Sequence, residues 1–204
     1  MVFCWFAISF NNLQCITIGF IIAHIHCLRY YLNEIDIEFE QNEKRRNISE
    51  QKEVDRKLIQ LIHQHQSCIK LYENLDIMGK PLFFCSITTI TFNLVCCGTA
   101  MVILLDSDFS GAAKMFIIYS CSIISFMLLC VPSQLLSNAS YEFYKESNCI
   151  NFHKYPPKTR VILLIMMMKI SDTFVLRAGP IYELSFETFS VVISSFQLQL
   201  KSQN

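Results

Sequence analysis

Long stretches of this chain lack charge. Residues 1–28, 82–105 and 115–141 contain no Lys, Arg, Asp or Glu. A helix that crosses a membrane needs about 20 apolar residues, and each stretch is longer than that. Helices of a soluble domain carry a polar face, which these stretches do not have, so three buried helices of a soluble protein are the disfavoured alternative. The absence of charge predicts three membrane-spanning helices.

Glycine, proline and net charge are also scarce, and each scarcity excludes a class of protein. With five Gly and five Pro among 204 residues, the composition is neither collagen-like nor disordered. A formal net charge of zero gives no reason to expect nucleic acid as a partner. The interiors of the uncharged stretches hold no paired acids, His–Asp pair or metal cluster. We therefore predict no catalytic residue, and an intramembrane enzyme is poorly supported.

Cysteine and histidine are present without the spacing of a metal site. None of the ten cysteines forms a Cys-x-x-Cys motif, and most lie in or beside an uncharged stretch, which is typical of small buried hydrophobes. The pairs His24/His26 and His63/His65 are two residues apart, so their members point to nearly opposite faces of a helix. We predict no metal site and no cofactor.

Charge between the uncharged stretches predicts the topology. Nine Lys or Arg residues fall within 29–81, six within 142–182 and one within 106–114, so 15 of the 17 share one side. The positive-inside rule places that side in the cytoplasm. Residues 1–28 lack the basic start and cleavage site of a signal peptide and are interpreted as a membrane helix. The turn at 106–114 is then external.

Two cytoplasmic regions have helical patterns. In the first, apolar side chains recur at alternating spacings of four and three, which predicts a helix packed against partner helices; they are Val54, Leu58, Leu61, His65, Cys68, Tyr72 and Leu75. In the second, Pro156-Pro157 opens a helix expected at 157–170. Its apolar run, Val161–Met168, is too short to span a membrane and is expected to pack against other cytoplasmic helices or subunits.

The last apolar segment combines acids with hydroxyl side chains. Gly179-Pro180 breaks the preceding helix, and Glu183 and Glu187 suit the N-terminus of a new one, where the helix dipole favours negative charge. Ser185, Thr188 and Ser195 belong to a polar stripe at helical spacing. Such a stripe indicates either hydrogen bonds between helices or a water-lined path, and the residues alone leave both open.

Three segments resemble the C-terminal half of insect odorant receptors. LIQLIHQHQSCIKLYENLDIMGKPLFF (58–84) is similar to the cytoplasmic helix that leads into the family's fifth membrane helix, with His65 at its histidine. YPPKTRVILLIMMMKISDTFVLRAG (155–179) resembles the basic, Met-rich helix before the last span. ELSFETFSVVISSF (183–196) resembles the final helix and its entry motif, with Leu184, Ser185, Glu187, Thr188 and Phe189 at motif positions.

The resemblance implies a partial inverted seven-helix bundle, an all-α polytopic membrane fold with a cytoplasmic anchor region. Combined with the charge pattern, the layout is a fourth helix at 1–28, an amphipathic anchor at 29–80, a fifth helix at 81–105, an external loop at 106–114, a sixth helix at 115–138, a cytoplasmic region at 139–182 with a helix at 157–170, and a last, pore-lining helix at 183–200. The chain is then a multi-pass plasma-membrane protein with an extracellular C-terminus.

The resemblance also implies function. The family forms odorant-gated, non-selective cation channels as hetero-tetramers with a co-receptor and takes small volatile organic ligands. Odorant contacts are expected at Phe3, Phe6, Phe116, Tyr119 and Ser122. The pore is expected to be lined by Ser194, Ser195, Leu198 and Lys201. The alternatives are a gustatory receptor of the same fold, and a fragment or assembly subunit without a ligand.

Overall fold

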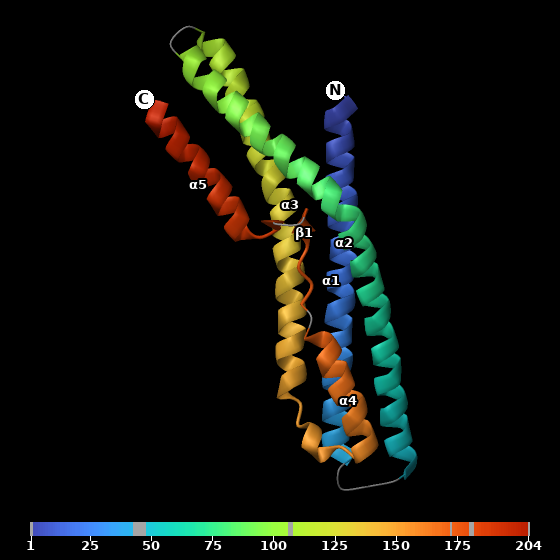
Figure 1. Cartoon of the computed structure of the whole chain (residues 1–204). Helices are drawn as coiled ribbons and strands as arrows, with labels where there is room; N and C mark the ends of the chain where they lie inside the picture. The colour runs from blue at the N-terminus through green and yellow to red at the C-terminus, as the bar shows by residue number, and fades with distance from the viewer. Residues whose placement is uncertain (1, 43–47, 106–107, 172, 180–181, 204) are drawn as a thin grey trace. The chain divides into compact units, whose positions relative to one another are not determined.

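The computed structural model describes residues 2–42, 48–105, 108–171, 173–179 and 182–203, with side chains for 12–39, 52–104, 108–171, 173–179 and 183–194. The elements in chain order are α1 (Val2–Asn42), α2 (Ile48–Leu105), α3 (Phe109–Cys149), the 3-10 turn η1 (Phe152–Lys154), α4 (Pro157–Ile170), strands β1 (Arg177–Ala178) and β2 (Tyr182–Glu183), and α5 (Phe186–Gln203) (Figure 1). The long helices confirm the expected all-α membrane fold.

Three helices are long and apolar enough to cross a membrane among the described residues: Asn12–Phe39, Lys52–Leu104 and Phe109–Cys149. Each is longer than a bilayer requires. The 58 residues of α2, for example, extend over roughly 85 Å at 1.5 Å per residue, against a hydrocarbon core of about 30 Å. Each helix therefore extends beyond the bilayer, and the uncharged stretches are the parts expected to lie in the membrane.

Exposed tyrosines lie where the uncharged parts end. Tyr30 and Tyr31 follow the uncharged stretch of α1, and Tyr141 ends that of α3; all three side chains are exposed. Tyrosine is enriched at membrane–water interfaces because its ring is apolar and its hydroxyl is hydrated. These positions fit the expected boundary.

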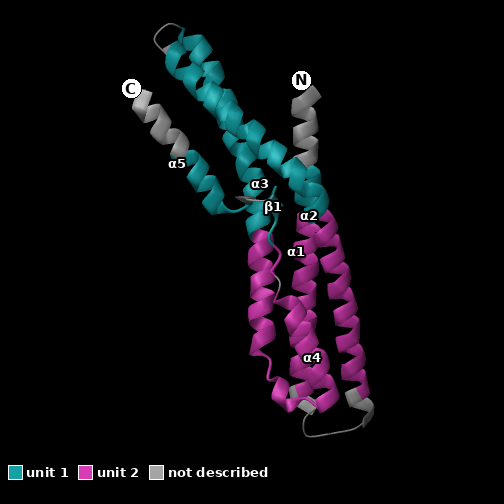
Figure 2. Ribbon diagram, viewed as in Figure 1, with its two compact units in different colours: residues 1–17, 76–134, 175–204 teal, residues 18–75, 135–174 magenta. Residues whose placement is uncertain are grey.

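The chain divides into two compact units, coloured separately in Figure 2. The second unit, Ile18–Leu75 with Leu135–Phe174, has a core formed by one stripe from each helix. The α1 stripe repeats every three or four residues and consists of Ile18, Ile21, Ile25, Leu28, Leu32 and Ile35. On α2, the expected apolar stripe is buried from Val54 to Cys68 and half-buried at Tyr72 and Leu75. Helical periodicity therefore identified the packed face of α2 correctly.

The first unit, Met1–Thr17 with Asp76–Gln134 and Val175–Asn204, contains a β-hairpin that the sequence did not lead us to expect. The polar hinge around Gly179 forms two antiparallel strands, with Arg177 paired to Glu183 and Ala178 to Tyr182. Gly179 has φ +66°, a left-handed conformation that glycine adopts most readily. The hinge therefore has regular hydrogen-bonded structure.

The start of the last helix also differs from the expectation. The helix begins at Phe186, whereas residue 183 was expected to open it. Glu183 lies in β2, where its carboxylate pairs with Arg177 at 3.7 Å, and only Glu187 lies in the first turn. The reason is local: Ser185 caps the helix, because its Oγ accepts a hydrogen bond from the Thr188 amide at 3.3 Å.

Candidate functional site

The hydroxyl groups at the base of α5 form its N-terminal cap. Thr188 donates its hydroxyl to the carbonyl of Glu183 at 2.6 Å, and its own amide donates to Ser185 Oγ. The second bond satisfies an amide that a helix start otherwise leaves unpaired. Ser185 and Thr188, the first two members of the expected polar stripe, therefore contribute to the start of the helix.

The other motif residues at this base also have defined places. Leu184 is buried, and the ring of Phe189 packs at a tilt against Phe126 of α3, with 5.2 Å between centroids. Glu187 is exposed in the first turn, where the helix dipole stabilises its charge. The structure thus brings Leu184, Ser185, Thr188 and Phe189 into one packed helix start.

The hairpin before α5 contacts α2. The amide of Gly179 donates to the carbonyl of Lys80 at 3.2 Å. A Cβ added at Gly179 would lie 3.1 Å from the ring of Phe84. One turn before Lys80, Asp76 forms an ion pair with the Lys80 ammonium group at 2.6 Å. Sequence reasoning treated Gly179 only as a helix breaker and missed its contact with α2.

The start of α5 also contacts α3. The amide of Phe186, the first residue of the helix, donates to Gln134 Oε1 at 3.4 Å. Together with the Phe126–Phe189 contact, this bond joins α5 to α3 in two places one turn apart. The hairpin and the first turn of α5 are therefore attached to both neighbouring membrane helices of the same unit.

The expected pore-lining residues lie mostly outside the described side chains. Ser194 is exposed, while the side chains of Ser195, Leu198 and Lys201 are outside the described residues, although α5 continues past them. Their role stays a prediction.

Of the expected odorant-contact residues, three have described side chains, all on α3. The ring of Phe116 is 56% exposed, while Tyr119 and Ser122 are half-buried. Ser122 donates its hydroxyl to the carbonyl of Ile118 at 3.1 Å, as serines in apolar helices commonly do. Phe3 and Phe6 have side chains outside the described residues. The exposed ring of Phe116 is available to a ligand or to another membrane helix.

His65 lies in a buried aromatic cluster of the second unit. Its ring packs at a tilt against Phe143, at 5.8 Å, and stacks on Phe174, at 6.4 Å. Phe174 in turn stacks on Tyr72 at 4.4 Å, and its amide donates to Ser140 Oγ at 3.0 Å. Burial, and secondarily nearby His24, lower the pKa of His65 to about 4. The ring is therefore neutral at physiological pH and has a packing role.

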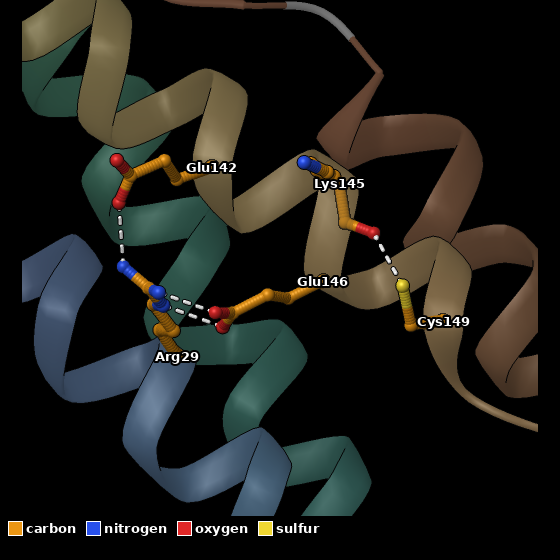
Figure 3. A network of polar contacts seen from close by, with 5 residues as sticks. All are labelled: Arg29, Glu142, Lys145, Glu146 and Cys149. Carbon is orange, nitrogen blue, oxygen red and sulfur yellow. Dashed lines mark hydrogen bonds and ion pairs between the residues drawn. The ribbon is translucent and has the colours of Figure 1, made fainter.

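An ion-pair network joins α1 to α3 just beyond the uncharged stretches (Figure 3). Arg29 donates two hydrogen bonds to the carboxylate of Glu146 and one, at 2.7 Å, to Glu142. The hydrogen bond with Glu146 raises the pKa of Arg29, and the bond from Arg29 lowers the pKa of Glu146. The i, i+4 spacing of the two glutamates was the available sequence signal, but it does not identify a partner on α1.

Other polar contacts join α4 and the residue two positions before it to α1 and α2. Tyr155 donates its hydroxyl to Asp36 at 2.8 Å, and buried Thr159 donates to Asp55 at 2.5 Å. Over the described part of the chain, no group of three or more His, Cys, Asp and Glu is placed to hold a metal ion. The two hydrogen bonds hold Tyr155 against α1 and Thr159 of α4 against α2.

One face of α4 is apolar and exposed. This run was expected to pack against other helices or subunits, and within the chain Leu163 and Met166 are buried, as are Thr159 and Ile170 of the same helix. The opposite side forms a stripe at helical spacing with exposed fractions of 40–74%; it consists of Val161, Leu164, Ile165 and Met168. An exposed apolar stripe of this kind marks a surface for association.

Comparison with known proteins gives one family. A family model described as "7tm Odorant receptor" matches residues 1–196. No curated protein matches the chain. The match contains α1 to α4 and both strands and continues into α5, so it extends well beyond the three segments quoted above.

Proposed function

The chain belongs to the odorant receptor family, and on this basis we propose that it is an odorant receptor subunit that gates a cation channel together with a co-receptor. The family match over 1–196 carries the proposal. Its helices would be the fourth to seventh of the family fold, with α5 lining the pore. The family is one of receptors rather than enzymes, and it favours an odorant over a gustatory receptor.

The membrane placement follows from the same premise. The long apolar helices and the family make the chain a multi-pass membrane protein. We place it in the plasma membrane with its C-terminus outside, because the basic residues cluster on the opposite side. Small volatile odorants suit a mostly apolar pocket with one or two hydroxyl groups, and Phe116, Tyr119 and Ser122 supply such groups on α3.

Current recording tests the receptor function. The chain and a co-receptor would be expressed together in oocytes, and a panel of volatile odorants applied. We expect at least one odorant to evoke an inward, non-selective cation current absent from oocytes with co-receptor alone. Surface expression of both chains without any such current would favour the alternative of an assembly subunit that binds no odorant.

The exposed stripe of α4 has the character of a binding surface for a partner subunit. The stripe lies on a segment too short to span a membrane and next to lysines, and its four apolar side chains are exposed. Burying side chains of this size stabilises an interface by about 1.5–3 kcal/mol each. We propose that the stripe packs against the co-receptor in the hetero-tetramer.

Co-purification tests this interface. The double substitution Val161→Glu with Ile165→Glu places two charges in the stripe, and we expect recovery of a tagged co-receptor to fall at least about tenfold. The matched control is Lys169→Glu, because Lys169 is exposed on the same helix and outside the stripe. Equal recovery of the co-receptor with the unsubstituted chain, the double variant and the control would show that the stripe does not bind the co-receptor.

A further inference from the structure

We infer that the β1–β2 hairpin and Gln134 position the base of α5 on α2 and α3, and that Gln134 and Gly179 are thereby positioning residues for channel opening. The gating part rests on the function proposed above. The structural part rests on contacts within the first unit alone.

The hairpin is attached to α2 through Gly179, a position where a side chain would be strained. Gly179 has φ +66°, which costs other L-residues energy, and its amide donates to Lys80 at 3.2 Å. A methyl group there would also meet the ring of Phe84 at 3.1 Å. Replacing Gly179 by Ala therefore strains the attachment of the hairpin to α2.

The hairpin is short and firmly closed. The amide of Leu184 donates to the carbonyl of Leu176 at 3.0 Å, beyond the strand pairs Arg177–Glu183 and Ala178–Tyr182. The side chains of Leu176, Ala178 and Leu184 are all buried. Bonded at its open end and buried on one face, the hairpin transmits a displacement of α2 rather than absorbing it.

The linker between the hairpin and α5 is short. Strand β2 ends at Glu183 and the helix begins at Phe186. The hydroxyl of Thr188 bonds back to the carbonyl of Glu183 at 2.6 Å, across this junction. A displacement of the hairpin therefore reaches the first turn of α5 directly.

Gln134 holds the same turn from α3. Its Oε1 accepts from the amide of Phe186 at 3.4 Å, one of the donors that a helix start leaves without an intrahelical partner. The Phe126–Phe189 contact lies one turn further along α5. The base of α5 thus follows both α2 and α3, so a movement of either helix shifts the proposed pore helix.

Amide hydrogen exchange tests the attachment without requiring channel activity. In purified full-length protein in nanodiscs, Gln134→Leu and Gly179→Ala should each raise the exchange rate of residues 186–190 about fivefold, the factor expected for loss of one hydrogen bond. Gln134→Glu keeps an acceptor and adds negative charge at a helix N-terminus, so its exchange should equal or fall below that of the unsubstituted chain. Leu135→Ala, at the exposed neighbour of Gln134 on α3, is the matched control and should change nothing.

Current recording on the same variants tests the gating part. With co-receptor present, we expect Gln134→Leu and Gly179→Ala to shift the half-maximal odorant concentration or the basal current at least about fivefold. Gln134→Glu should keep both quantities at the values of the unsubstituted chain. Unchanged exchange in both substituted chains overturns the attachment. Faster exchange with an unaltered odorant response overturns the gating role. Absence of current even from the unsubstituted chain refutes the proposed function, while the exchange data still decide the attachment.

Discussion

At the scale of single residues, His65 shows how burial sets protonation. Its ring packs against Phe143 and Phe174 and is almost inaccessible to solvent. Burial disfavours the charged imidazolium, which lowers the pKa from 6.5 to about 4. His65 lies in the charged part of α2, outside the uncharged stretch at 82–105 that is expected to lie in the membrane.

This shift predicts a loss of stability in mild acid. A folded-state pKa below the unfolded value means that the unfolded chain binds more protons between pH 6.5 and 4, so stability falls as pH falls through that range. From pH 7 to pH 5 the free energy of unfolding should drop by about 2 kcal/mol because of His65. Thermal unfolding in nanodiscs at the two pH values measures it.

The control for this prediction separates His65 from other groups. His65→Gln should show a smaller loss between pH 7 and 5, whereas His153→Gln, at an exposed position, should lose as much as the unsubstituted chain. The lowered pKa of Glu146 acts in a lower range, because its contribution is lost only below the ordinary carboxyl pKa. An identical pH dependence in the His65 variant would contradict the assignment.

At the scale of elements, the long helices are continuous while the last one depends on its cap. Pro81 lies inside α2 and Pro132 inside α3, and neither ends its helix. Each is flanked by many turns of intrahelical hydrogen bonds, so the loss of one bond at a proline is tolerated. By contrast, α5 has 18 residues and begins directly after a hairpin. Its start therefore relies on Ser185 and Thr188.

Removing the cap should destabilise α5. Ser185→Ala deletes the acceptor for the Thr188 amide, at an expected cost of about 1 kcal/mol. For a chain of this size we expect the melting temperature to fall by about 2–4 °C, measured by thermal unfolding in nanodiscs. Ser185→Asp retains an acceptor and should melt near the original temperature. Ser190→Ala, on the exposed side of the same helix, is the control. An equal fall in its melting temperature would show that loss of the cap is not the cause.

At the scale of the whole molecule, charge distribution predicts which side of the membrane each segment occupies. The sequence contains two glycosylation motifs, Asn47-Ile-Ser49 and Asn138-Ala-Ser140, and the predicted topology puts both on the cytoplasmic side, with Asn138 at the end of the sixth helix. Asn47 is outside the described residues. Asn138 lies within α3, and Ser140 is buried with its hydroxyl bonded to the Phe174 amide. The second motif is therefore already engaged in packing.

Glycosylation in microsomes tests this topology. We expect neither Asn47 nor Asn138 to receive a sugar, since acceptor sites in secreted or luminal segments alone are modified. A glycosylation motif added after Asn204 through a flexible spacer should be modified if α5 crosses the membrane and the C-terminus is external. Glycosylation of Asn138 without glycosylation of the added motif would indicate the opposite orientation in the membrane.

The sequence by itself determined the features that depend on local pattern. Uncharged stretches predicted the long membrane helices, since length and apolar composition decide what can cross a bilayer. Periodicity predicted the buried face of α2 from Val54 to Cys68, because side chains three and four residues apart share one side of a helix. Resemblance identified Ser185, Thr188 and Phe189 at the base of α5 but not what they touch.

Only the tertiary structure decided which distant residues meet. Arg29 bonds Glu142 and Glu146, Gly179 bonds Lys80, and Phe186 bonds Gln134; each pair is separated by 50 residues or more. No local pattern specifies such a partner, because the contact depends on how helices are placed side by side. The hairpin was missed because its two-residue strands are too short for a periodic signal, and its contact with Lys80 of α2 depends on the same placement.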